Sequence, residues 1–330
     1  MLIGELTRGT RLTGVLSSGG RSGPDSYVPI DVEDIVVDDL TFSKAITDSW
    51  ETISQISASG NAQQYYAVGD CKAIHIAGTV GTLEVDTTLY AVILGFDHNA
   101  ELEGYGITFG LFESDELGVD VALCDANYGS PDTSGLKWFN MNHRQGSDSY
   151  GHNFGGWKGC DMRYDILGST DVPPSCYGAA ATTANVGYDA TSTCATNPVA
   201  NTLMSCLPSD LRSVMKPMTK YTDNAGNASN TEANVTASVD YLPLLSEYEV
   251  QGARAYANQY EQTKQAQYAF YASGNGKIKY HHTATSSPVI WCVRSPHYNY
   301  SNFFCLVNNY GTVGSASSRY SRGIAPIFLV

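Results

Sequence analysis

Short apolar runs alternate with polar, tyrosine-rich segments near the C-terminal end of the chain. The runs at residues 289–293, 303–307 and 324–330 have the length and the β-branched or aromatic content that are typical of buried strands. The segments between them consist almost entirely of Tyr, Asn, Ser, Arg, His and Gly. This pattern predicts a rigid strand scaffold that carries polar loops.

The composition of these loops is typical of a binding surface. Tyrosine offers a large contact area at a small entropic cost, asparagine and serine offer adaptable hydrogen bonds, and glycine permits turns. The alternative is that they are ordinary solvated turns, although clustered aromatic residues in polar loops carry a solubility cost. We predict that the ligand contacts come from His297, Tyr298, Asn299, Tyr300, Asn302, Asn308, Asn309, Tyr310, Ser315, Ser317, Ser318, Arg319 and Tyr320.

The rest of the chain shows signals for both helices and strands, so we expect an α+β fold. Asp48 and Glu51 are spaced like the start of a capping box, and the helix that follows is expected to stop at Gly60. Further strands are expected at residues 73–77, 90–96 and 107–112. A second helix is expected near Pro208, on an apolar stripe formed by Leu207, Leu211, Val214, Met215 and Met218.

The length and composition bound the domain organisation. A chain of 330 residues with 42% apolar content can form one large domain or two moderate ones. Residues 1–40 are rich in Gly, Ser and Thr and are too few to form a core, so we expect an N-terminal segment that docks elsewhere. We expect a globular domain at residues 41–330, with a long loop inserted near 170–200.

Charge and hydropathy argue against several partners. The formal net charge is −14, so neither a nucleic-acid backbone nor an anionic membrane is an expected partner. No apolar run has the length that crosses a bilayer, and residues 1–20 lack the apolar core of a signal peptide. We therefore expect a soluble protein with no membrane insertion and no secretion by the general route.

Eight cysteines are scattered along the chain without a Cys-x-x-Cys pair or a histidine at an interval suited to zinc. Several lie inside apolar runs, where a free cysteine behaves as a small hydrophobic residue. We predict reduced, structural thiols. The alternative is oxidation, for which the first pairs to examine are Cys176 with Cys194 and Cys292 with Cys305.

Two groups of polar residues invite a catalytic interpretation. Asp97, His98 and Asn99 could form an acid–base or metal cluster, but Asp and Asn at the end of a strand more commonly form a turn. Glu247 and Glu249 could be the carboxylate pair of a glycosidase, but residues at i and i+2 point opposite ways on a strand and do not stack on a helix. We therefore predict structural roles, and we expect no enzyme activity, no catalytic residue, no metal and no cofactor.

A glycine-rich element precedes a further expected helix. Gly155 and Gly156 permit a tight turn, Trp157 can fill core volume, and Arg163 is expected to meet a buried carboxylate or carbonyl. The alternative role for Arg163 is anion binding in a cleft.

Several motifs together resemble an uncharacterised domain family that is abundant in gut bacteria and their phages. The motifs are Gly95-Phe-Asp-His-Asn99, Gly155-Gly-Trp-Lys-Gly-Cys-Asp-Met-Arg163, Trp291-Cys-Val-Arg-Ser-Pro296 and Gly323-Ile-Ala-Pro-Ile-Phe328. The layout is also similar to the variable proteins of diversity-generating retroelements, which end in a C-type-lectin-like fold and in which randomised template adenines turn Asn codons into Tyr, Ser, His, Asp or Asn. The resemblance covers most of the chain from residue 41 to 330 and implies a C-type-lectin-like domain with framework residues Trp291, Arg294, Gly311, Gly323 and Pro326.

This resemblance implies a receptor-binding protein of the tail-fibre or adhesin type on the surface of a phage virion, made in the host cytoplasm. Its partner would be a host cell-surface glycan or protein. Residues 1–40 resemble the virion-anchoring ends of phage fibre proteins and would contact other virion proteins; the alternative is a disordered tail. We expect a homo-oligomer, namely a trimer, because weak single sites gain from multivalency. Two alternatives stay open: a structural virion component such as a head-decoration or head-fibre protein, and an enzyme like the formylglycine-generating oxidases, which needs a reactive cysteine pair.

Overall fold

The computed structural model describes residues 45–114, 119–132, 136–142, 152–174 and 187–330. The expected N-terminal segment at residues 1–40 lies outside the described residues, as does part of the expected insertion near 170–200. None of the helices in the described ranges has the length and hydrophobicity needed to span a bilayer.

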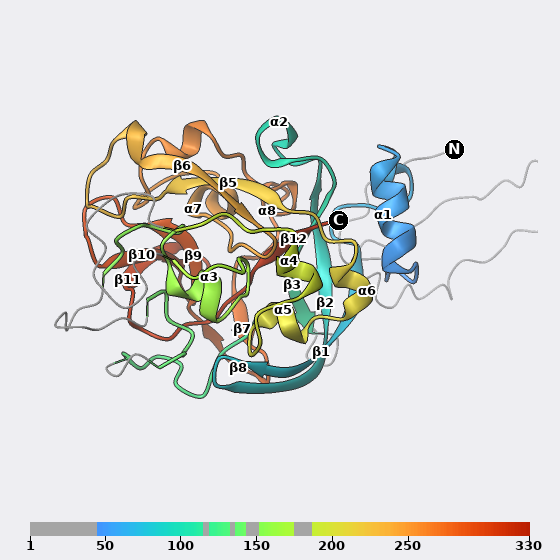
Figure 1. Ribbon diagram of the computed structural model, residues 1–330, viewed down its shortest axis with the longest axis horizontal. Helices are drawn as coiled ribbons and strands as arrows, with labels where there is room; N and C mark the ends of the chain where they lie inside the picture. Colours follow the sequence, from blue (N-terminus) through green and yellow to red (C-terminus); the bar gives the residue numbers. More distant parts are fainter. Residues whose placement is uncertain (1–44, 115–118, 133–135, 143–151, 175–186) are drawn as a thin grey trace, which may run out of the picture. The chain divides into compact units, whose positions relative to one another are not determined.

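The largest sheet has seven strands, in the order β1-β2-β3-β4-β7-β8, with β12 added against β3 (Figure 1). Strand β3 pairs with β4 near Glu113 and with β12 near Gly110, so the C-terminal strand occupies the other half of the same strand edge. The strands are β1 (Cys71–Val80), β2 (Leu83–Phe96), β3 (Ile107–Ser114), β4 (Val119–Ala122), β7 (Lys279–His281), β8 (Ala284–Val289) and β12 (Ile327–Leu329). Because β12 is buried in this sheet, the end of the chain is part of the core.

Two smaller sheets complete the β-structure of the described residues. One has three antiparallel strands in the order β11-β10-β9, with β9 at Trp291–Pro296, β10 at Phe303–Val307 and β11 at Val313–Ser317. The other pairs β5 (Met218–Asp223) with β6 (Val235–Asp240). Figure 1 shows β9, β10 and β11 near one another, with β5 and β6 above them in that view.

The helices are short. The longest in the described ranges is α1 (Trp50–Ala58), with nine residues. The others are α2 (Ala100–Glu103), α3 (Asp161–Asp165), α4 (Thr193–Thr196), α5 (Leu203–Cys206), α6 (Ser209–Arg212), α7 (Glu247–Gln251) and α8 (Ala269–Ala272), with 3₁₀ turns at Ala62–Gln64, Glu232–Asn234 and Glu261–Thr263. The fold is therefore α+β, rich in strands, as expected from the sequence.

Most of the expected strands are present. The run 303–307 coincides with β10, and the expected strands at 73–77, 90–96 and 107–112 lie within β1, β2 and β3. The run 289–293 is divided, because β8 ends at Val289 and β9 begins at Trp291. The expected N-terminal helix is also present, but its N-cap is Ser49, whose hydroxyl accepts a hydrogen bond from Thr52 N at 3.1 Å.

Helix α1 is held against the main sheet by aromatic packing. The Trp50 ring meets Phe109 of β3 edge-on, with centroids 5.3 Å apart, and Phe328 of β12 at 5.9 Å. Phe109 and Phe328 themselves stack at 5.4 Å. Edge-to-face and offset-stacked rings add to the free energy of apolar burial, so this trio fixes the helix to two strands that are distant in sequence.

A helix does begin directly after Pro208, at Ser209, but the expectation that it continues along the apolar stripe to Met218 was wrong. Helix α6 has only four residues, and Met218 begins strand β5. The residue before a proline disfavours the helical region, and Leu207 is extended, with ψ at 145°. Leu211 and Met215 are buried, so the apolar pattern predicted which residues are buried but not their secondary structure. The hydrogen bonds between β5 and β6 override the local helical signal.

The expectation of reduced thiols is confirmed for six cysteines. Cys124, Cys160, Cys194, Cys206, Cys292 and Cys305 are buried and free. The suggested bridge between Cys292 and Cys305 is therefore not formed, and Cys176 lies outside the described residues. Burial raises the pKa of Cys194 and of Cys292 to about 12.

These buried thiols are expected to react slowly with a soluble disulfide reagent. Only the thiolate is nucleophilic, and burial both blocks access and raises the pKa of these groups. In a Cys176→Ser variant, we expect labelling of the native protein at least about a hundredfold slower than labelling in denaturant, since opening must precede reaction. Rapid labelling of Cys292 or Cys305, located by mass spectrometry, would contradict the expectation.

Candidate ligand-binding surface

The three-stranded sheet divides the predicted contact residues between its two ends. Strand β10 pairs with both neighbours, so that Phe304 lies opposite Pro296 of β9 and Phe303 lies opposite Ser317 of β11. The β9–β10 loop at residues 297–302 therefore lies next to residues 318–320, and Ser318 N donates to Asn302 O at 2.9 Å. The β10–β11 turn at residues 308–312 lies at the opposite end, roughly 14 Å away along five residues of strand.

At the first end, exposed and buried residues form two layers. Asn299 and Tyr300 are exposed, and 51% of the surface of Tyr300 is accessible. Tyr298, Asn302, Ser317, Arg319 and Tyr320 are half-buried. His297 and Ser318 are buried, so they lie beneath the surface that they were expected to form.

His297 supports the loop from below. Its ring stacks on Tyr298 with centroids 5.4 Å apart and on Tyr256 at 5.3 Å, and Tyr300 meets it edge-on at 4.7 Å. Its Nδ1 accepts a hydrogen bond from Asn299 N at 3.0 Å. Burial lowers the pKa of His297, which favours the neutral form needed for this bond.

Asn153 is a supporting residue that the sequence did not indicate. Its side-chain amide donates to the carbonyl oxygens of Tyr300 at 2.8 Å and of Phe303 at 2.9 Å, and its backbone N–H donates to Ser301 O at 2.8 Å. Three bonds from one residue fix the β9–β10 loop. The sequence feature that could have indicated this role is its position two residues before Gly155, in a turn-forming segment.

The segment 254–257 forms a second support, and it is organised by Glu247. The Glu247 carboxylate accepts hydrogen bonds from the backbone N–H groups of residues 255, 256 and 257. Tyr256 O in turn accepts from Tyr298 N at 2.8 Å, and the Arg254 guanidinium lies 5.3 Å from the Tyr298 ring. Glu247 is therefore committed to holding backbone, in agreement with its predicted structural role.

The turn at the opposite end of β10 is also well ordered. Asn308 Oδ1 accepts from Tyr310 N at 2.9 Å and from Thr312 N at 3.2 Å. Gln251 of α7 donates to Gly311 O at 3.1 Å. Tyr310 projects from this turn with 77% of its surface exposed. Asn309 is half-buried beside it, and Ser315 is half-buried within β11.

A buried charge network contains Arg294, a predicted framework residue, and Glu249, which the sequence analysis considered as part of a carboxylate pair. Arg294 donates to both carboxylate oxygens of Glu249, one of them at 2.9 Å. Lys220 donates to Glu249 at 3.0 Å, to Tyr268 Oη at 2.9 Å and to Glu103. Burial alone would raise the pKa of Glu249, but Arg294 and Lys220 hold it well below its usual range. Glu249 is therefore an ionised structural anchor.

The same network contains the best metal-like grouping among the described residues. Potential ligand atoms of His98, Glu103 and Glu249 lie within 4.8 Å of one another. The Lys220 ammonium, however, already donates to both carboxylates, so a fixed cation of the protein neutralises the oxygens that would attract a metal ion. We therefore assign this cluster a structural role.

The motif Asp97-His98-Asn99 forms a turn. Asp97 and Asn99 have positive φ angles of 47° and 48°, which these residue types tolerate better than most. Asp97 Oδ1 accepts from Gly106 N at 2.9 Å. The His98 ring stacks on Tyr268 at 3.6 Å, and burial with the nearby Lys220 charge lowers its pKa to about 3. The backbone angles and the Asp97 hydrogen bond confirm the predicted turn.

The role predicted for Arg163 is confirmed as well. Its Nε donates to Asp240 Oδ1 at 2.5 Å, and both side chains are buried. Trp157 Nε1 also donates to Asp240, at 3.2 Å, and Ser238 Oγ does so at 2.7 Å. This element is a satisfied core network and not an open anion site.

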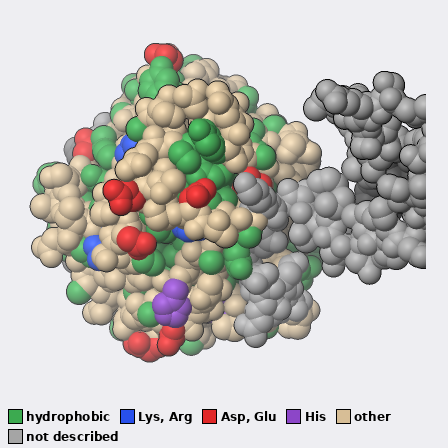
Figure 2. Space-filling view, turned by 90° about the vertical axis from the view of Figure 1, so that its right-hand side faces the viewer, with side chains coloured by type: hydrophobic (Ala, Val, Ile, Leu, Met, Phe, Trp, Pro, Cys, Tyr) green, Lys and Arg blue, Asp and Glu red, His purple; other side chains and the backbone are tan. Residues whose placement is uncertain are grey.

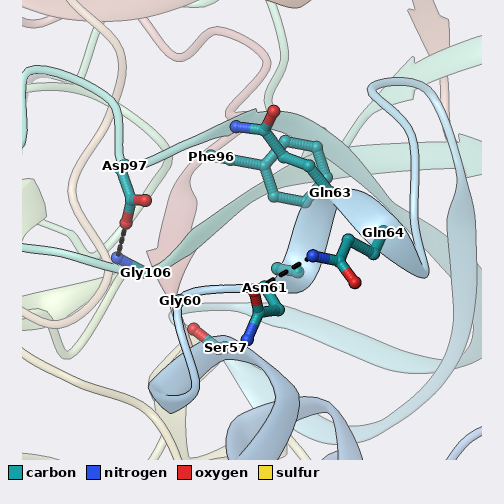
Figure 3. Close-up of a pocket in the computed structure, with 9 residues that line it drawn as sticks. Ser57, Gly60, Asn61, Gln63, Gln64, Phe96, Asp97 and Gly106 are labelled. Carbon is teal, nitrogen blue, oxygen red and sulfur yellow. Dashed lines mark hydrogen bonds between the residues drawn. The ribbon is translucent and has the colours of Figure 1, made fainter.

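A separate pocket of about 350 Å³ lies between α1, the following 3₁₀ turn and the end of β2 (Figure 3). Its lining is mostly polar, and several groups are already engaged. Gln64 donates to Asn61 at 3.1 Å, Asp97 is bound to Gly106, and Ser57 donates to Val330 O at 2.6 Å. The pocket contains none of the predicted contact residues.

Comparisons with known proteins place the chain in a family but supply no function. Neither the search of curated proteins nor the search of solved structures found a significant match. A family model matches residues 136–330, which is more than half of the chain and includes the whole three-stranded sheet. The chain therefore belongs to the family described as "Domain of unknown function (DUF6273)".

Proposed function

We propose that this protein binds a ligand on a host cell surface through the β9–β10 loop and the adjoining residues 317–320. One observation carries the proposal: exposed Asn299 and Tyr300 are presented by a loop whose backbone is fixed from below. Preorganisation of this kind lowers the entropic cost of binding. A solvated turn without a partner does not require the dedicated support of Asn153 and His297.

The second part of the proposal concerns how the surface residues arose and where the protein is displayed. Tyrosine, asparagine and serine on a fixed framework are the residues expected from a retroelement-diversified surface, and the buried side chains of Trp291 and Arg294 fit a framework role. We propose a C-type-lectin-like domain displayed on a phage virion, with residues 1–40 contacting other virion proteins and trimeric assembly increasing avidity. The partner would be a glycan or a protein on the host surface.

The surface charge supports a partner other than nucleic acid. Figure 2 shows the right-hand side of Figure 1, which lies away from β9, β10 and β11; Asp and Glu side chains are scattered over this face, and few Lys or Arg side chains are visible there. Together with a net charge of −14, this surface would repel a phosphate backbone.

A second candidate function is favoured by Tyr310. This side chain is 77% exposed at the opposite end of the sheet from Tyr300, so the two tyrosines are poorly placed to contact one small ligand. A contact between neighbouring subunits, as in a structural virion protein, would explain an exposed tyrosine on an ordered turn. The oxidase alternative lacks such support, because Cys292 and Cys305 are buried and their pKa values are raised.

Substitution of Tyr300 by alanine is expected to reduce cell binding. Tyrosine is enriched among interface hot spots, whose truncation costs about 2 kcal/mol or more. We therefore expect a loss of about thirtyfold in affinity of the labelled protein for a strain selected from a panel of gut bacteria. Tyr310→Ala is the matched control and should bind within about twofold of wild type.

The pattern across the two variants separates the functions. If Tyr310→Ala abolishes assembly while Tyr300→Ala leaves cell binding intact, the structural-protein alternative is favoured. Equal binding by wild type and Tyr300→Ala, at unchanged melting temperature, would contradict the proposed recognition surface.

A further inference from the structure

Two arginines flank one tyrosine next to the proposed recognition loop. The guanidinium carbons of Arg319 and Arg322 lie 5.8 Å and 5.1 Å from the centroid of the Tyr320 ring. Ser318, immediately before them, is hydrogen-bonded to Asn302 of the β9–β10 loop. The arginine pair therefore lies on the segment 319–322, which leads away from the loop end of the three-stranded sheet.

The backbone that carries the pair is fixed by residues 130–132 and by Phe139. Asp132 N donates to Arg319 O at 2.8 Å, Ser321 N donates to Ser130 O at 2.9 Å, and Arg322 N donates to Phe139 O at 2.9 Å. The two cations are thus presented by a segment whose backbone is held by these hydrogen bonds and not by a free loop.

Neither guanidinium is paired with a carboxylate of the described residues. Within the described residues, no carboxylate oxygen lies within 4.0 Å of either group, and the Nε atoms of both are buried without a hydrogen-bond partner. The neighbouring carboxylate of Asp125 is committed to Ser321 Oγ at 2.8 Å and to Phe139 N at 2.7 Å. Arg322 Nη1 donates only to the carbonyl oxygen of its neighbour Ser321, at 3.4 Å. The other described arginines donate to Asp240, to Glu249 or to backbone carbonyls of residues farther away along the chain: Arg163, Arg212, Arg254 and Arg294.

This arrangement is costly without an anion. Two like charges around one ring repel each other, and partly buried donors without acceptors lose their hydration. The Tyr320 ring offsets part of this cost by cation–π attraction. The planar fork of arginine matches the two oxygens of a carboxylate, so an oxyanion at the outer Nη atoms would pair with donors that no carboxylate of the described residues engages.

We infer that Arg319 and Arg322 form an oxyanion subsite and that the ligand of the recognition surface is a carboxylate-bearing saccharide. This inference rests on the proposed function of the β9–β10 loop. The saccharide is favoured because exposed Tyr300 can stack on the apolar C–H face of a sugar ring, while Asn299 and Ser301 offer amide and hydroxyl partners for sugar hydroxyls. The acidic surface elsewhere favours a ligand with isolated charges over a dense polyanion.

The test uses trigalacturonic acid as the acidic probe and its methyl ester as the neutral probe of the same shape. We expect wild type to bind the acid at least about tenfold more tightly than the ester, and added salt to weaken the acid complex. Arg319→Gln and Arg322→Gln should each lose about tenfold in affinity for the acid and little for the ester. Lys264→Gln, which removes one positive charge elsewhere, is the matched control and should bind like wild type.

Several outcomes would overturn the inference. Equal binding of acid and ester by wild type, or no binding of either, would do so without any variant, so the test does not depend on how well the arginine variants fold. Equal or stronger competition by a tri-glutamate peptide would point to an acidic protein ligand and reject the saccharide. If Lys264→Gln loses as much affinity as the arginine variants, the effect comes from the net charge of the protein and not from a subsite at the two arginines.

Failure of this inference can be distinguished from failure of the proposed function. If cells are bound through Tyr300 while both arginine variants bind them like wild type, the subsite is wrong and the recognition surface stands. If both arginines are needed for the acid probe while Tyr300→Ala leaves cell binding intact, the subsite stands and the proposed host-binding role fails.

Discussion

Replacing Glu249 with glutamine is expected to lower the free energy of unfolding by about 3–5 kcal/mol, the range found when one partner of a buried ion pair is removed. Glutamine keeps the size of the side chain, so the loss is electrostatic. It leaves Arg294 and Lys220 buried, with Glu103 as the remaining carboxylate partner of Lys220. Urea denaturation followed by tryptophan fluorescence measures the change.

Glu232→Gln is the matched control for this substitution. Glu232 is exposed, and its substitution removes the same charge, so the free energy of unfolding should change by no more than about 0.5 kcal/mol. A loss below about 1 kcal/mol for Glu249→Gln would mean that the network contributes little beyond packing.

Gly156→Ala is expected to cost at least about 3 kcal/mol, which is at the high end for a single substitution. Gly156 has a φ of +53°, and an added Cβ would lie 1.9 Å from the carbonyl oxygen of Asp223. The obstacle is backbone, so no side-chain rotation relieves it. The same urea titration, with melting temperature as a second readout, measures the effect.

Gly60→Ala separates the two causes of this cost. Gly60 also has a positive φ, +71°, but an added Cβ meets nothing within 4 Å. It should therefore lose only the penalty for a left-handed alanine, about 1–2 kcal/mol. Similar losses at both positions would show that backbone conformation, and not the close approach to Asp223, is what Gly156 provides.

Glu249 and Gly156 both support the proposed recognition surface. Gly156 closes a turn onto Asn153, whose carbonyl oxygen accepts from Gly156 N at 2.9 Å, and Asn153 holds the β9–β10 loop. Glu249 anchors Arg294, which lies on β9, the strand leading into that loop. A destabilised variant that still folds is therefore expected to bind less tightly, because loop order is lost before the global fold.

Local sequence patterns were enough to predict those helices and strands whose conformation does not depend on their neighbours in the fold. The run 303–307 became β10 because apolar β-branched and aromatic side chains suit a buried strand in almost any sheet. The pattern near Pro208 misled, because the same apolar residues satisfy a helix or a set of short buried segments. There the pairing of β5 with β6 decided the outcome.

The sequence by itself determined the α+β class, the free buried cysteines, the Arg163 anchor and the turn at Asp97, since each follows from residue chemistry over a few positions. Only the tertiary structure decided which predicted contacts share a surface. Strand register placed Tyr300 and Tyr310 at opposite ends of β10, buried His297, and brought Asn153 to a loop 147 positions away in sequence. The physical reason is that register and long-range packing depend on the summed contacts of the whole domain, which no local pattern encodes.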